Sequence, residues 1–246
     1  MRLFPIFGLA LGVALIASAC SSSESAVEPA ALPAAPTASI ESVTPEPTSI
    51  PTPSQPKGKV LYLTFDDGPT KPYTTQLLTA LQNSDATATF FVNGNMARAN
   101  PDVLQAITDA GQAIGNHSYD HPNFTSLSDA EVANQIKSTT KVVGAAMGAC
   151  VRPPYLATND RIRAVTKGLG YATIMGDLAA QDWTNPSVPD LVASLRGATR
   201  DGNVIILHDG PADRANTVAA VKQMLPVWRK QGYSLAALPK CSPRSS

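Results

Sequence analysis

Carboxylate and imidazole side chains follow the apolar runs of this sequence. Asp66 and Asp67 come after the run Val60–Thr64, at a Gly-Pro turn, and all three histidines of the chain follow other apolar runs. An unpaired buried charge is costly, so a carboxylate pair at such a place favours chemistry over packing. A solvated Asp-Asp-Gly-Pro turn is the alternative for this stretch alone.

Two of the histidines have the spacing of metal ligands. His117 and His121 are four residues apart, and a helical turn would place both imidazoles on one face. Two histidines and one aspartate, with a position left open for water, are typical of a catalytic zinc site. The spacing therefore predicts a divalent metal, most simply Zn²⁺.

Strands and helices must position these groups, and between residues 58 and 241 apolar runs alternate with amphipathic stretches. The expected strands are Val60–Thr64, Ala86–Val92, Ala113–Gly115, Val151–Pro153, Ala172–Met175, Val204–Leu207 and Tyr233–Ala237. The expected helices are Tyr73–Asn83, Pro101–Ala110, Asp129–Met147, Asp160–Lys167, Pro189–Gly197 and Ala215–Lys230. This alternation predicts an α/β fold with a parallel sheet or barrel. Active sites of such folds lie at the carboxyl ends of the strands, where the carboxylates and histidines fall.

The segments around this domain predict export. Residues 1–19 combine Arg2, an apolar stretch and small residues, as in a signal peptide. Their end resembles a bacterial lipobox, which predicts a lipidated Cys20 and a membrane anchor, with simple secretion as the alternative. Residues 20–57 contain eight prolines and no aromatic residue, which predicts a disordered tether. Residues 242–246 form a short tail.

The cysteines and the overall charge add two expectations. With Cys20 set aside, Cys150 and Cys241 are an even pair, which in an exported protein predicts a disulfide. Two independent thiols are the alternative. Formal net charge is +0, with 19 acidic and 19 basic residues, so we expect no nucleic-acid partner. We also expect a monomer.

Five segments of the domain, in order, resemble the motifs of the polysaccharide deacetylases of the NodB-homology type, carbohydrate esterase family four. The segments are Thr64–Gly68; His117, Ser118 and His121; Arg152, Pro154 and Tyr155; Asp182-Trp183; and Ile206-Leu207-His208. The resemblance implies a distorted (β/α) barrel with about seven parallel strands. It also implies metal-dependent hydrolytic N-deacetylation of a glycan.

The resemblance implies roles at the metal. Asp67, His117 and His121 would bind a divalent metal, usually zinc. Asp66 would be the general base that takes a proton from the attacking water, and Arg152 would hold Asp66 in place. The metal would lower the pKa of the water, and the resulting hydroxide would attack the carbonyl of an N-acetyl group.

The resemblance also implies roles around the leaving group. His208 would be the general acid that protonates the amine, and Asp182 would hold its imidazole. The backbone N–H of Tyr155 would stabilise the oxyanion. Trp183 and Leu207 would form an apolar pocket for the acetyl methyl. Trp183 has a plain alternative as a core residue.

An exported, anchored enzyme of this kind is expected to lie at the cell membrane, facing the cell wall. Its expected substrate is N-acetylglucosamine of peptidoglycan. The alternatives are a chitooligosaccharide deacetylase, an O-acetyl xylan esterase, and a glycan-binding protein with weakened catalysis.

Two positions depart from the family pattern. Many relatives have an acidic residue beside the motif arginine where this chain has Ala179, and Asp177 is a candidate substitute. Glycine usually follows the motif tyrosine, and here Leu156 follows it. The first departure would change the tuning of Asp66, and the second would reshape the substrate groove.

Overall fold

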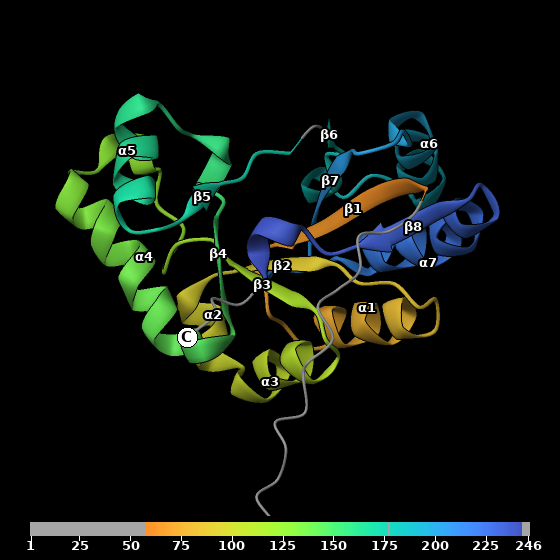
Figure 1. Cartoon of the computed structure of the whole chain (residues 1–246). Coiled ribbons are helices and arrows are strands. Elements are labelled where there is room, and N and C mark those ends of the chain that lie inside the picture. Colours follow the sequence, from red (N-terminus) through yellow and green to blue (C-terminus); the bar gives the residue numbers. More distant parts are fainter. Residues whose placement is uncertain (1–57, 177, 243–246) are drawn as a thin grey trace, which may run out of the picture. The chain divides into compact units, whose positions relative to one another are not determined.

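The computed structural model describes residues 58–176 and 178–242, drawn in colour in Figure 1. The expected signal peptide (1–19), Cys20 and the tether (20–57) lie outside the described residues. Asp177 and residues 243–246 of the tail lie outside them as well. Within the described part of the chain, no helix is long and apolar enough to cross a membrane.

The described strands form one parallel sheet of eight strands. The strands are β1 (Lys59–Asp66), β2 (Thr89–Val92), β3 (Ala113–Asn116), β4 (Met147–Val151), β5 (Ala172–Thr173), β6 (Leu178–Ala179), β7 (Val204–His208) and β8 (Tyr233–Ala236). Their order is β5-β4-β3-β2-β1-β7-β6, with β8 paired to β1. Because β5 and β6 end this order without pairing to each other across the described residues, the barrel is open, as expected for a distorted (β/α) barrel.

Strand β1 is the centre of the sheet. Its second half pairs with both β2 and β7, which places Asp66 beside Phe91 and His208. Its first half pairs with β8. Side chains alternate along a strand, so Leu61, Leu63 and Phe65 enter the core while Thr64 and Asp66 face the other way.

Seven helices of the described chain surround the sheet, with α4 and α5 on one flank and α6 and α7 on the other (Figure 1). Helix α4 begins with a capping box, in which the Ser128 side chain and Glu131 satisfy each other's backbone N–H groups. The helices are α1 (Tyr73–Gln82), α2 (Gly94–Ala99), α3 (Pro101–Asp109), α4 (Asp129–Val143), α5 (Asp160–Gly168), α6 (Val188–Ala198) and α7 (Ala215–Lys230).

The structure corrects several expected boundaries. Strand β2 begins at Thr89 and not at Ala86, and strand β5 ends at Thr173 and not at Met175. The helix expected at Asp129–Met147 ends at Val143, because Gly144 leaves the helical region with φ +68°. The strand expected at Val151–Pro153 is instead β4, which begins at Met147 and ends at Val151. Proline lacks the N–H that a strand ladder needs, so the strand stops before Pro153.

Two elements were not expected from the sequence. Strand β6 has 2 residues, too few to show an alternating pattern. Helix α2 has 6 residues and is separated from α3 only by Asn100. Neither element contributes a strong periodic signal.

The expected disulfide is confirmed. Cys150 in β4 is bonded to Cys241 in the short 3-10 helix η5 (Pro239–Cys241), and both residues are fully buried. The bond holds the C-terminal end of the described chain against the strand that leads into Arg152.

Candidate active site

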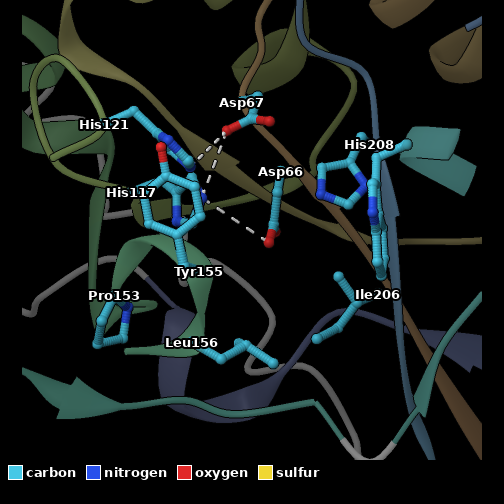
Figure 2. Close-up of a pocket in the computed structure, with 10 residues that line it drawn as sticks. Asp66, Asp67, His117, His121, Pro153, Tyr155, Leu156, Ile206 and His208 are labelled. Atoms are coloured by element: carbon cyan, nitrogen blue, oxygen red, sulfur yellow. Dashed lines mark ion pairs between the residues drawn. The ribbon is translucent and has the colours of Figure 1, made fainter. Parts of the chain in front are cut away.

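Seven of the expected site residues meet in one pocket of about 400 Å³ at the carboxyl ends of β1, β3, β4 and β7 (Figure 2). Those that line it are Asp66, Asp67, His117, His121, Tyr155, Trp183 and His208. Arg152 and Asp182 are buried behind the lining and hold two of these residues.

Three side chains of the pocket have the spacing of ligands around one ion. Asp67 Oδ1 lies 3.4 Å from His117 Nε2 and 3.3 Å from His121 Nε2. Ligands held tetrahedrally about 2.0–2.1 Å from a zinc ion lie roughly 3.3–3.4 Å apart. The two separations from Asp67 therefore fit a shared ion, and because the three ligand atoms all lie within 4.8 Å of one another, these residues could hold one metal ion.

The protonation of the two histidines also fits a cation. His117 Nδ1 lies 2.8 Å from the carbonyl oxygen of Arg152, and a carbonyl only accepts, so Nδ1 donates; in the neutral ring this leaves Nε2 as the nitrogen with the lone pair that a metal would bind. Burial lowers the pKa of His121, against the opposing charge of Asp67, which favours the neutral ring. Two lone pairs and a carboxylate that face one point repel each other, so a divalent metal between them suits this donor set.

The turn between the two histidines is not helical. Ser118 and His121 instead have left-handed backbones, with φ of 71° and 64°. Ser118 Oγ accepts a 3.0 Å hydrogen bond from the His121 N–H, and Asn116 Oδ1 accepts one of 2.9 Å from the Ser118 N–H. These bonds turn the loop so that both imidazoles face Asp67, and Ser118 thus supports the loop.

Asp66 lies beside the three candidate ligands and forms an ion pair with the buried Arg152. Arg152 Nη1 donates to Asp66 Oδ1 at 2.6 Å and to Thr64 Oγ1 at 2.8 Å. The guanidinium also stacks on Phe91, 4.1 Å from the ring centroid. Asp66 Oδ2 makes no hydrogen bond with the described residues and lies 3.9 Å from His117 Nε2. One carboxylate oxygen is thus fixed and the other faces the pocket.

Arg152 is incompletely paired at its other edge. Its Nε and Nη2 are buried without a hydrogen-bond partner among the described residues. Ala179, the departure noted in the sequence, lies in β6 beside Ile206 of β7, and Asp177 lies outside the described residues. Within the described chain, Asp66 is the only carboxylate paired with Arg152.

Asp182 holds His208 in place through hydrogen bonds. Asp182 Oδ1 lies 2.7 Å from His208 Nδ1, and Oδ2 accepts from the His208 N–H and from Thr217 Oγ1, both at 2.9 Å. Burial disfavours the charged imidazole, but the hydrogen bond and charge of Asp182, with the more distant Asp66 and Asp67, outweigh it and raise the pKa of His208. Nε2 is the ring nitrogen left for a substrate.

Two exposed aromatic rings stand beside the histidines. Tyr155 is 68% exposed and packs edge-on against His121, and Trp183 is 47% exposed and packs edge-on against His208. Trp183 is therefore not the core residue of the plain alternative. The Tyr155 backbone N–H makes no hydrogen bond within the described residues, so it is able to donate to a ligand.

The expectation for Leu207 is wrong. Leu207 is buried in the main hydrophobic core, and Ile206 lines the pocket instead. His208 faces the pocket, and side chains two apart on a strand share a face. The alternation of side chains along β7 therefore places Ile206 in the pocket, and this alternation could have been used to predict Ile206 from the sequence.

Sequence reasoning also missed a buried carboxyl under the site. Asp209 Oδ1 accepts a 3.1 Å hydrogen bond from the Gly68 N–H, and Oδ2 accepts one of 2.5 Å from Thr74 Oγ1. A Cβ at Gly68 would lie 2.3 Å from Asp209 Oδ2, so this turn needs glycine. Burial raises the pKa of Asp209 to about 7. The position of Asp209 directly after His208 was the sequence signal that could have identified it as part of the site.

Asn93 was missed as well. Its Nδ2 donates to Asp67 Oδ1 at 3.3 Å. Asn93 directly follows β2, and that position at a strand end was the signal in the sequence.

Comparison with known proteins adds family information to this geometry. Residues 54–174 match the family model described as polysaccharide deacetylase. A peptidoglycan-N-acetylglucosamine deacetylase of Bacillus cereus is 35% identical over 76% of this chain and 91% of the relative. A chitooligosaccharide deacetylase of Azorhizobium caulinodans is 33% identical over 73% of this chain and 92% of its own. The structure of the peptidoglycan deacetylase PdaC from Bacillus subtilis superposes with a TM-score of 0.70 at 31% identity, covering 75% of this chain and 90% of that one.

Proposed function

Because this chain belongs to the polysaccharide deacetylase family, we propose that it hydrolyses the acetamide of N-acetylglucosamine residues in peptidoglycan, releasing acetate. The observation that carries the proposal is the placement of Asp66 and His208 in one pocket with three side chains that could hold a metal ion. Amide hydrolysis needs a base, an electrophile and a proton donor, and the pocket supplies all three.

We propose zinc as the ion, held by Asp67, His117 and His121. A bound divalent ion would polarise the substrate carbonyl and make water more acidic. The donor separations and the His117 tautomer support this assignment.

Asp66 is the general base in this proposal. It accepts a proton from water while the water oxygen bonds to the carbonyl carbon. Arg152 fixes Oδ1 by a hydrogen bond, which leaves Oδ2 for the water. The Tyr155 N–H donates to the carbonyl oxygen as its negative charge develops.

His208 is the general acid. Its Nε2 gives a proton to the amide nitrogen as the C–N bond breaks, so the products are acetate and a free amino sugar. Asp182 fixes Nδ1 and stabilises the protonated ring before the transfer. Trp183 and Ile206 provide apolar surface for the acetyl methyl.

Chitooligosaccharides are the second candidate substrate, since the relative from Azorhizobium caulinodans acts on them by its name. The relative from Bacillus cereus and the Bacillus subtilis structure favour peptidoglycan. We also propose that Cys20 is lipidated, that residues 20–57 act as a tether, and that the protein is a monomeric lipoprotein of the cell membrane facing the cell wall; the lipobox-like end of residues 1–19 supports the anchor.

Acetate release by the full-length chain tests this function. Peptidoglycan, chitin oligomers and acetylxylan are compared before chelation, after chelation and after zinc is returned. We expect zinc-restored release from an N-acetylated glycan, with peptidoglycan the best substrate. Asp66→Asn should abolish release and keep zinc binding, whereas the exposed Asp109→Asn should behave as wild type.

Two outcomes would overturn parts of the proposal. Release from acetylxylan alone would make the protein an O-acetyl esterase. No release from any substrate, with zinc bound, would make it a glycan-binding protein.

A further inference from the structure

Leu156 occupies a backbone position that favours glycine. It has φ +54°, directly after Tyr155 at φ +59°, and its N–H donates to the Pro153 carbonyl at 3.1 Å. Left-handed backbone is uncommon for residues other than glycine, asparagine and aspartate. Such strain persists where the surroundings require it, and it clusters at functional sites. Since glycine would adopt this backbone without strain, the presence of a leucine side chain at this position requires an explanation.

The Leu156 side chain lies in the pocket. It is half-buried and lines the cavity together with Ile206 of β7. Figure 2 shows the two side chains pointing toward each other, on the side of Asp66 away from Asp67. Pro153 and Trp183 are the other apolar residues of the lining. The pocket thus has a polar side that holds Asp67 and the histidines, and an apolar side formed partly by Leu156.

The reaction fixes which part of a substrate meets this apolar side, if the proposed function holds. The carbonyl carbon must lie near Asp66, and the nitrogen must lie near Nε2 of His208. The acyl chain is the one wholly apolar part of an N-acyl amino sugar near the reacting bond. Its burial against Leu156 and Ile206 is favoured because those surfaces leave water together.

We propose that Leu156 is a specificity-determining residue that, opposite Ile206, closes the acyl end of the pocket and restricts the enzyme to acetyl groups. Glycine at this position would accept the same backbone without strain and would leave room for a longer acyl chain. Because the interior around a tight pocket resists overpacking, a propionyl or butyryl group would meet the Leu156 side chain. This inference rests on the proposed function and adds the acyl length to it.

Matched substrates that differ only in acyl length test the proposal. The full-length chain would be given N-acetyl, N-propionyl and N-butyryl forms of one glucosamine oligosaccharide, and kcat/KM would be measured for each. One methylene in an apolar pocket changes kcat/KM by roughly 10–200-fold. We expect the wild-type chain to prefer acetyl over propionyl within that range, and Leu156→Gly to reduce the preference by about 10-fold or more.

Three further variants separate side-chain volume from backbone strain. Leu156→Ala should also reduce the preference for acetyl over propionyl. It replaces Leu156→Gly in the test if the glycine variant does not fold. Leu156→Asn suits left-handed backbone and keeps a side chain of similar length, so it should retain most of the preference for acetyl. Asp85→Gly relieves a left-handed residue that is exposed and does not line the pocket, so its preference should equal that of wild type.

The outcomes separate this inference from the proposed function. Acetyl release with an unchanged acyl preference in both Leu156→Gly and Leu156→Ala would overturn the role of Leu156 and leave the deacetylase intact. If Leu156→Asn reduced the preference for acetyl as much as Leu156→Gly does, the argument that side-chain volume sets the preference would be overturned. No release by the wild-type chain from any N-acyl substrate would overturn both proposals.

Discussion

Replacing Asp182 with asparagine should lower the pKa of His208 and thereby move the alkaline limit of activity. Asp182 Oδ1 lies 2.7 Å from His208 Nδ1, and the two side chains are 0% and 15% exposed. Solvent therefore screens the pair only slightly. An asparagine in either amide orientation removes the negative charge that favours the imidazolium.

The magnitude follows from that single contact. A hydrogen bond to a charged group contributes about 1.5–3 kcal/mol, and one pKa unit corresponds to about 1.36 kcal/mol. The pKa of His208 should therefore fall by roughly 1–2 units. A general acid must carry its proton, so activity is lost as the pH rises through its pKa. A lower pKa moves that loss to lower pH by the same interval.

Two measurements check the effect, namely the pH dependence of kcat/KM and NMR titration of the His208 ring. Asp109→Asn is the matched control, because Asp109 is exposed and its side chain bonds only to Gln105 within the described residues. A His208 pKa that does not fall in Asp182→Asn would refute the electrostatic argument. A pKa that falls while the alkaline limit stays fixed would show that His208 is not the acid.

The disulfide, the buried Asp209 and the Ser118 loop each lead to a further test. Replacing Cys150 and Cys241 with alanine should lower the free energy of unfolding by about 4.6 kcal/mol, since the bond closes a loop with a sequence separation of 91 residues. Urea unfolding measures this free energy, and a loss below about 1 kcal/mol would contradict the chain-entropy account. The pKa of Asp209 is raised to about 7, so the folded chain keeps a proton that the unfolded chain loses above about pH 4, and stability should fall as the pH rises through this window. Asp209→Asn still accepts from the Gly68 N–H and should flatten that fall in chelator-treated protein, whereas equal pH slopes in the two chains would refute the shift. Ser118→Ala removes the acceptor that orients the second histidine ligand, and a competition assay should show roughly 10–100-fold weaker zinc binding, with unchanged affinity as the contrary result.

The sequence predicted the reacting groups better than their supports. Asp66, Asp67, His117 and His208 follow strands of a parallel sheet, and the carboxyl ends of such strands meet at one edge, so their order in the sequence implied their proximity. Ile206 also follows from the alternation of its strand. The residues that hold these groups in place, Arg152 and Asp182, were expected only from the family resemblance.

The unpredicted features depend on contacts between segments distant in sequence. The His117–His121 loop turns through left-handed residues and a Ser118 hydrogen bond, not through a helix. Asp209 supports Gly68 across 141 positions of the chain. The position of Leu156 opposite Ile206 depends on how two loops and a strand pack, which no local pattern encodes.

The pairing of β1 has a consequence for how the protein acquires activity. Strand β1, which ends at Asp66 and leads directly into Asp67, lies near the start of the domain, and two of its partners, β7 and β8, lie near the end. A growing chain that stops before β7 has Asp66 and Asp67 but lacks His208 and one whole edge of its central strand. Pairings so distant in sequence form slowly and late. Hydrolytic activity should therefore appear in a single step when the last strands join, and truncated chains should have none.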